Sequence, residues 1–260
     1  MKIFLERIGK RVIDFLQTSG QIIYFSFDCL RLIIRKGIRL EQIGEEVFEL
    51  GVNAFGIISI SALATGMVLA VQSAVVLVRF GATEYIAGLI ALSLVRELGP
   101  VLASLIFIGK SGAKISAELG TMSVNEQLLA TRALGIDPIG FFGVSRIIAC
   151  VIALPLLVFW CEILGIFGGL LISTFQVGIN PFFYMHQTID SLKLIDFTGG
   201  MIKTVVFSIL IGIICCFKGF NTRGGSLGVG KNTTQAVALS SILVIVSNFF
   251  LTKIIITFWG

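Results

Sequence analysis

The sequence predicts an all-α integral membrane protein, and its composition and apolar runs support this fold class. Of its 260 residues, 56% are hydrophobic and only 13% are charged, with a mean hydropathy of +0.99. A soluble domain usually carries about 25% charged residues. Several apolar runs approach the roughly 20 residues that a spanning helix needs. Alternating ten-residue segments, which are typical of membrane strands, are absent. We therefore expect one helical membrane domain.

The N-terminal segment, residues 1–51, is predicted to lie at the membrane surface. Residues 2–17 carry many charged residues, with apolar side chains at helical spacing at Leu5, Ile8, Val12 and Phe15. This pattern is typical of an amphipathic interfacial helix, although a helix packed on another protein domain would look similar. We expect a second interfacial or half-inserted piece at 21–36 and a charged connector from Arg39 to Glu49.

The remainder, residues 52–258, is predicted to form the transmembrane domain. Small residues crowd its first apolar segment, and such residues let membrane helices approach closely. The predicted spans are about 52–78, 85–108, 144–175, 199–217 and 233–258.

Lysine and arginine predict how these spans are oriented. Residues 1–51 carry eight of them, residues 109–146 carry four and residues 218–232 carry three. The connections on the other side carry only Arg79, Lys193 and Lys253. The positive-inside rule places the basic side in the cytoplasm or its equivalent, so five spans leave the C-terminus outside.

A short polar helix at about 124–134 is predicted between the second and third spans. Ser123 and Glu126 have capping-box spacing, and Gly135 and Pro138 are typical of a helix end. A membrane transporter subunit would present a coupling helix to an ATPase at this place, through Glu126, Gln127 and Arg132. An interfacial helix without a partner is the alternative.

Glu97 and Lys203 are the costly residues of the predicted spans. A charge at mid-membrane costs about 2.5–3.5 kcal/mol on insertion scales and marks a candidate functional site. A structural ion pair that fixes helix packing is the alternative. Pro100 should kink or break the helix beside Glu97, because a proline removes a backbone hydrogen bond and clashes with the carbonyl of Arg96 four residues earlier. We place Arg96 and Glu162 nearer the membrane interfaces.

Other motifs carry less weight. Residues 224–232, GGSLGVGKN, nearly match a phosphate loop, but Asn232 replaces the Ser or Thr that binds magnesium, and no strand precedes it. The five cysteines form no CxxC pair and are expected to be buried free thiols. The sole histidine, His186, has no partner for a metal site. No cofactor or metal is expected. Nucleic acid is not expected as a partner either, because membrane topology and anionic lipid headgroups explain the net charge of +5.

Four stretches make the chain resemble the MlaE permease family, the membrane subunits of ABC-type lipid transporters that work with MCE-domain proteins. The first, 96–138, contains RELGP, AELGTM and LGIDP. The others are ALPLLVFWCEILGIFGG at 153–169, MIKTVVFSILIG at 201–212 and the run from GFNTRGG to NFFLT at 219–252. The resemblance covers roughly 45–258. The members of this family include bacterial permeases, the chloroplast lipid-import permease and plastid-encoded relatives.

The resemblance implies an MlaE-type fold with an N-terminal interfacial helix, five spans and a cytoplasmic coupling helix. It implies a non-catalytic permease in a plastid or bacterial inner membrane, working as a homodimer with a separate ATPase subunit and an MCE protein. Phospholipid would occupy a cavity between the two copies. The family's functional residues match Glu97 and Lys203, with Arg96 beside them. Asn232–Thr233, where relatives often carry Ala–Thr, is a departure.

Two other function classes stay open on the sequence. One is an ion-coupled secondary transporter that uses Glu97 and Lys203, although internal repeats are absent. The other is a membrane scaffold that anchors an MCE protein.

Overall fold

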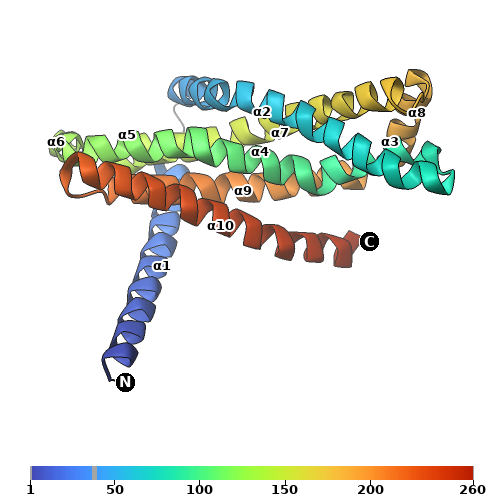
Figure 1. The fold of residues 1–260 in the computed structure, drawn as a ribbon. Helices are drawn as coiled ribbons and strands as arrows, with labels where there is room; N and C mark the ends of the chain where they lie inside the picture. The colour runs from blue at the N-terminus through green and yellow to red at the C-terminus, as the bar shows by residue number, and fades with distance from the viewer. Residues whose placement is uncertain (1, 37–39, 260) are drawn as a thin grey trace.

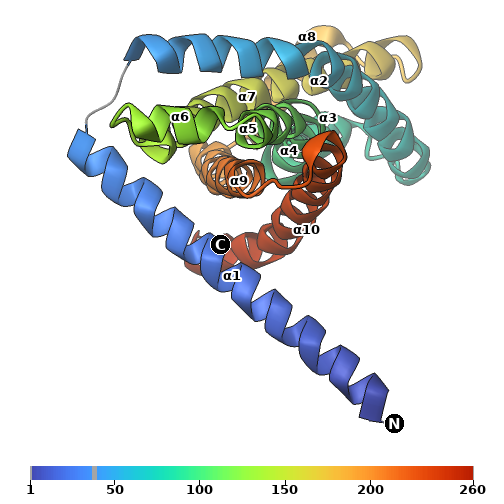
Figure 2. The same ribbon diagram turned by 90° about the vertical axis from the view of Figure 1, so that its left-hand side faces the viewer.

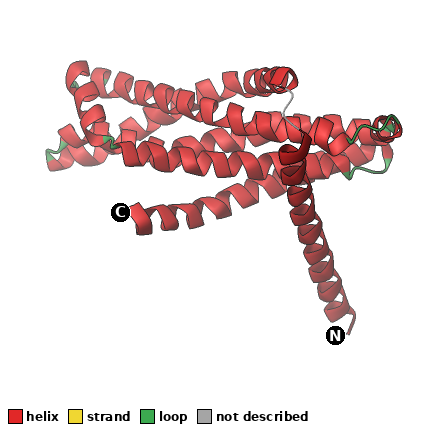
Figure 3. Ribbon diagram, turned by 180° about the vertical axis from the view of Figure 1, so that it is seen from behind, coloured by secondary structure: helices red, strands yellow, loops and turns green. Residues whose placement is uncertain are grey.

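The structure, a computed structural model that describes residues 2–36 and 40–259, is an elongated bundle of long helices (Figure 1). Within these residues there is no strand, and the connections are short (Figure 3). Five segments are long and apolar enough to cross a membrane: Leu40–Phe80, Thr83–Val124, Ile139–Phe175, Leu194–Phe220 and Gly225–Phe258. The predicted all-α membrane fold with five spans is confirmed.

The N-terminal helix, α1 (Lys2–Lys36), lies crosswise to the spans, and its first half extends beyond the bundle (Figures 1 and 2). It is one continuous helix, so the expected break between two interfacial pieces is wrong. Its second half packs on the bundle through Phe25, whose ring centroid lies 5.9 Å from those of Phe217 and Phe220. The side chains of the predicted apolar stripe (Leu5, Ile8, Val12 and Phe15) lie outside the described part of the chain.

The first span is α2 (Leu40–Leu77), which packs along α7 (Val144–Phe175). The charged residues before 50 belong to α2 rather than to a connector, apart from Arg39, which lies outside the described residues. Glycine sets the distance between these helices, because a Cβ added at Gly66 would overlap the carbonyl oxygen of Gly165. Backbone contact of this kind is typical of small residues in membrane bundles.

The second span follows two short 3₁₀ turns, η1 (Val78–Phe80) and η2 (Thr83–Tyr85), and is interrupted by two π-helical turns. It consists of α3 (Ile86–Ser93), η3 (Leu94–Leu98), α4 (Gly99–Phe107), η4 (Ile108–Gly112) and α5 (Ala113–Val124). Such turns occur often at functional sites. The first one contains Arg96 and Glu97, so the predicted kink at Pro100 takes the form of a π turn.

The polar helix of the connection, α6 (Gln127–Ala133), is shorter than expected. The predicted capping box is wrong. Ser123 belongs to α5, and its hydroxyl lies 3.1 Å from the carbonyl oxygen of Thr222, 99 residues away. Glu126 occupies the N-cap position with a positive φ of 60°. The predicted C-terminal glycine is confirmed, since Gly135 has φ 78° and its N–H donates to the carbonyl of Arg132.

The third span begins with a π turn, η5 (Ile139–Gly143), and continues as α7. At the other end of the bundle α8 (Pro181–Ser191), capped by Asn180, leads to α9 (Leu194–Phe220). The last helix, α10, spans Gly225–Trp259. The predicted glycine-rich loop is therefore largely helical, because only residues 221–224 separate α9 from α10.

Charged side chains join three helices at the end of the bundle that carries α6. Arg146 of α7 is buried, with Nη2 2.9 Å from Glu118 of α5 and Nε 3.2 Å from Glu46 of α2. Lys114 of α5 forms ion pairs with Glu118 and with Glu49 of α2. This network holds the ends of the helices that flank α6 in fixed positions relative to α2.

Candidate functional site

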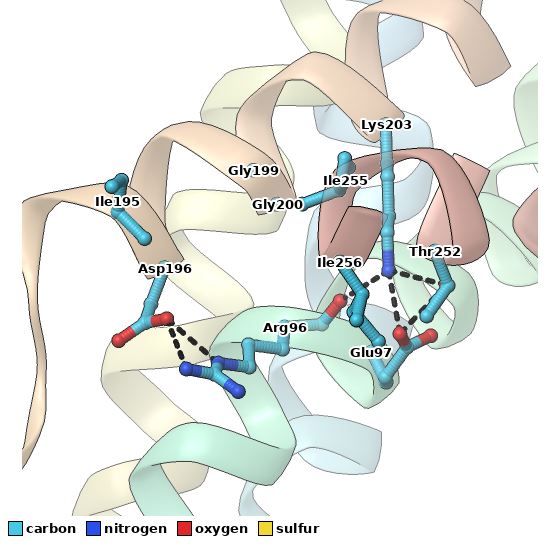
Figure 4. Close-up of a pocket in the computed structure, with 10 residues that line it drawn as sticks. All are labelled: Arg96, Glu97, Ile195, Asp196, Gly199, Gly200, Lys203, Thr252, Ile255 and Ile256. Atoms are coloured by element: carbon cyan, nitrogen blue, oxygen red, sulfur yellow. Dashed lines mark hydrogen bonds and ion pairs between the residues drawn. The ribbon is translucent and has the colours of Figure 1, made fainter. Parts of the chain in front are cut away.

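Glu97 and Lys203 meet inside the membrane domain, on η3 and α9 (Figure 4). The Lys203 Nζ lies 2.6 Å from Oε1 of Glu97, and the Lys203 side chain is only 3% exposed. Glycine permits the approach, since a Cβ added at Gly200 would overlap the carbonyl oxygen of Val95. The sequence indicated both residues, and the structure pairs them directly.

Pro100 explains why the lysine points to this turn. A proline has no N–H, so the carbonyl four residues earlier, that of Arg96, loses its helical donor. Lys203 Nζ donates to this carbonyl at 2.8 Å (Figure 4). A buried carbonyl without a donor would be costly in a membrane, so the proline and the lysine stabilise each other's positions.

The last helix supplies two polar partners that the sequence reasoning missed. Asn248 Nδ2 donates to Oε2 of Glu97 at 2.9 Å. Thr252 Oγ1 lies 2.7 Å from Oε1 of Glu97 and accepts from Lys203 Nζ at 2.8 Å. The available signal was the spacing of these residues, which places two polar side chains on one face of an apolar helix. All three protons of the Lys203 ammonium thus have acceptors.

Arg96 lies beside this pair and points toward Asp196 (Figure 4). Its Nε and Nη2 lie 2.7 and 2.5 Å from Oδ1 of Asp196, whose side chain is 2% exposed. The Arg96 side chain is 54% exposed, so it is the open member of the site. Asp196 was also missed, although it precedes Lys203 by two helical turns and so shares its face of α9.

Two pockets adjoin the four charged groups. The first, of about 90 Å³, lies between the π turn, the start of α9 and α10, and includes Arg96, Glu97 and Lys203 in its wall (Figure 4). The second, of about 480 Å³, lies along α10 and reaches Glu97, and its wall combines apolar side chains with polar ones, including Asn248, Thr252 and Lys253. Most of the surrounding surface is hydrocarbon, so a ligand with an apolar body and a charged end fits it.

The predicted coupling residues lie far from this site, at the opposite end of the bundle on or beside α6 (Figure 1). Glu126, Gln127 and Arg132 are all exposed. Arg132 also lines a groove of about 1100 Å³ between α6 and α1. The second span contains Glu97 and ends at Val124, and the turn that follows leads directly into α6, so this span connects the two sets of residues.

Glu162 does not lie at a membrane interface, as the sequence reasoning expected. It sits near the middle of α7 and is 3% exposed, and its Oε1 has no hydrogen-bond partner. A Cβ added at Gly99 would lie 3.0 Å from its Cγ, so Glu162 packs against the residue that follows the π turn.

Comparison with known proteins identifies the family. The family model of the permease MlaE matches residues 43–254. A probable ABC transporter permease protein of Rickettsia typhi is 39% identical over 248 residues, which cover 95% of this chain and 96% of that protein. The intermembrane phospholipid transport system permease protein MlaE of Haemophilus influenzae is 35% identical over 255 residues, or 96% and 97% of the two chains.

A chloroplast protein is also related. The protein TRIGALACTOSYLDIACYLGLYCEROL 1 of Arabidopsis thaliana is 34% identical over 221 residues, which cover 85% of this chain and 63% of that protein. The family match reaches all five membrane segments and includes the whole of the Glu97–Lys203 site. The chain is therefore a multi-pass membrane protein that belongs to the MlaE family of ABC transporter permeases.

Proposed function

We propose that this chain is the permease subunit of a complex that moves phospholipid or a related lipid between membranes, driven by a separate ATPase subunit. The observation that carries the proposal is the fully bonded Glu97–Lys203 pair beside the exposed Arg96, within the second and fourth membrane segments. The names of two relatives support it. The name of the Haemophilus protein refers to phospholipid transport, and the name of the Rickettsia protein refers to an ABC transporter.

The site has the chemistry for a lipid headgroup. Arg96 offers a planar, bidentate donor set that suits a phosphate group. Its present partner, Asp196, also accepts from the backbone N–H of Lys193, so the carboxylate keeps a donor if Arg96 turns to a ligand. Glu97 and Lys203 would hold the π turn in place and balance the charge of the bound headgroup, while the acyl chains lie against the surrounding apolar side chains.

The ATPase would dock at α6, where Glu126, Gln127 and Arg132 are accessible between two spans. The crosswise α1 would lie in the interface of the same side, as part of the proposed surface segment 1–51. In this arrangement the basic end faces the cytoplasm or its equivalent, as the positive-inside rule predicts. The opposite end, with α8, would face an MCE-domain protein, and two copies of the chain would enclose the lipid cavity.

The complex itself provides the test. The chain carrying an affinity tag is purified from its native membrane in mild detergent, and co-purifying proteins and lipids are identified by mass spectrometry. We expect an ATPase subunit, an MCE protein and phospholipid, with the lipid reduced in an Arg96→Ala variant. An ion-coupled transporter would purify without an ATPase. A scaffold would purify with the MCE protein but bind no lipid that depends on Arg96.

A further inference from the structure

The outer segment of α10, residues 245–258, is poorly attached to the bundle. It diverges from α9 toward the C-terminus (Figures 1 and 3). In the most apolar stretch of 18 residues in α10 only 11% of the residues are buried, compared with 61% in the corresponding stretch of α9. Large apolar side chains of this segment, including Ile245, Phe249 and Ile254, are about half exposed or more. Little apolar packing therefore holds the segment in its observed position.

Hydrogen bonds to the Glu97–Lys203 pair attach this segment to the bundle. Asn248 and Thr252, one turn apart, bond both oxygens of the Glu97 carboxylate, and Thr252 also accepts from Lys203. Two half-buried apolar side chains lie beside them: Leu251 packs against the hydrophobic core, and Ile255 packs against Gly199, which has no side chain. The segment is thus held near one turn, by these polar bonds together with Leu251 and Ile255.

This turn separates the two pockets of the site. Glu97, Thr252 and Ile256 line both the pocket of about 90 Å³ and the pocket of about 480 Å³. If the outer segment moves away, the two pockets join into one that opens sideways toward the bilayer. The smaller pocket alone cannot hold a lipid headgroup with its glycerol, whereas the joined space reaches Arg96 from the apolar surface.

We propose that Asn248 and Thr252 form a latch that closes α10 over the Glu97–Lys203 pair, and that release of this latch admits a lipid headgroup from the side. The inference rests on the proposed lipid transport and adds the route of entry and two positioning residues. A headgroup would replace the bonds that release breaks: phosphate oxygens accept from Lys203, and a headgroup hydroxyl or ammonium donates to Glu97.

The closed latch leaves polar groups incompletely satisfied, which favours an equilibrium between two states. Asn248 Oδ1 is buried without a hydrogen-bond partner. The single hydroxyl proton of Thr252 serves either Glu97 Oε1 or the carbonyl oxygen of Asn248, 2.8 Å away. A buried acceptor without a donor opposes closure, so modest binding energy from a headgroup suffices to shift the latch.

Distance measurement between spin labels tests the latch in the intact complex. Cysteines replace two exposed residues at the α8 end, Leu194 on α9 and Phe258 on α10, and labelled protomers are diluted with unlabelled ones. The five native cysteines are buried, which limits unwanted labelling. The variants are Thr252→Val, Asn248→Leu and both together. Thr234→Val is the matched control, because Thr234 is exposed elsewhere on α10 and its hydroxyl donates to the backbone carbonyl of Gly230 in the same helix.

Removing the latch should raise the ratio of long to short distances about three- to twentyfold, the range expected for single hydrogen bonds within membrane proteins. Thr252→Ser, which keeps the hydroxyl, and the control should match the wild type. Unchanged distances in the double variant would overturn the latch, and so would an equal shift in Thr252→Ser, because that shift would reflect lost packing.

A photoactivatable phospholipid tests entry separately. It should label the wall residues of the site more strongly when the latch is removed, in proportion to the shift in distance. A distance shift without increased labelling would overturn lipid entry by this route. No labelling of any variant, with the distance shift intact, would instead contradict the proposed function and leave α10 closure by Asn248 and Thr252 standing.

Discussion

Lys203 shows how a charge is accommodated inside this membrane domain. Its ammonium has three protons, and each has an acceptor: the Glu97 carboxylate, the Thr252 hydroxyl and the Arg96 carbonyl. The last acceptor exists because Pro100 supplies no N–H. Two residues that look unfavourable in a transmembrane helix, a proline and a lysine, therefore compensate each other.

This arrangement predicts the outcome of exchanging the two charges. The single changes Glu97→Lys and Lys203→Glu should each reduce the yield of assembled complex, because breaking a buried pair costs about 3–5 kcal/mol. The 36% exposure of the Glu97 side chain places this pair toward the lower end. The double exchange should recover part of the yield, measured by size-exclusion chromatography, but not lipid transport. The Arg96 carbonyl would still lack the hydrogen bond that Lys203 donates to it. Each exchanged charge would also face a headgroup group of the same sign as itself. Full recovery of transport would show that the pair is only structural.

At the scale of helices, close packing of α2 on α7 depends on glycine. Gly66→Ala should separate the two helices, because the new Cβ would overlap the Gly165 carbonyl, and we expect a destabilisation of about 3 kcal/mol or more. Gly56→Ala on the same helix is the matched control, since the Cβ that alanine adds there meets no neighbouring atom within 4 Å. Thermal unfolding in detergent measures both. Equal melting temperatures for the two variants would contradict the observed packing.

Helix α6 carries a prediction about partner binding. Glu126→Lys and Arg132→Glu should weaken co-purification of the ATPase while membrane insertion stays normal, because both side chains are accessible and make no interhelical ion pair among the described residues. Glu84→Lys, a charge reversal at the other end of the bundle, serves as the control. Unchanged ATPase recovery in both α6 variants would place the docking surface elsewhere.

The helices also show which features a sequence can predict. Long apolar runs were enough to predict the number of spans, since a membrane helix satisfies its own backbone groups and needs only length and hydrophobicity. The capping box failed because the Ser123 hydroxyl has a partner at Thr222, which only the folded chain brings near. For the same reason the sequence could indicate Glu97 and Lys203 as site residues, because a charge inside a membrane span costs free energy. Their partners Asp196, Asn248 and Thr252 could be identified only from the structure.

For the whole molecule, the crosswise position of α1 supports a location at the membrane surface. A helix of 35 residues is about 50 Å long at about 1.5 Å per residue, which would be long enough to span, but α1 runs crosswise to the spans (Figure 2). Cysteines introduced at Lys10 or Asp14 should react with an impermeant thiol reagent from the cytoplasmic side. The native Cys29 should react slowly, because burial raises the pKa of its thiol to about 12. Labelling at positions 10 and 14 from the opposite side only would reverse the proposed topology.

ATP-dependent lipid transfer by the reconstituted complex tests the central claim most directly. The complex is placed in vesicles with a fluorescent phospholipid, and transfer is compared among the wild type, Glu97→Ala, Lys203→Ala and a complex whose ATPase subunit cannot hydrolyse ATP. We expect transfer by the wild type with ATP, loss of transfer without hydrolysis, and a strong reduction in both alanine variants that still assemble. Transfer driven by an ion gradient without ATP, or normal transfer by both alanine variants, would contradict the account.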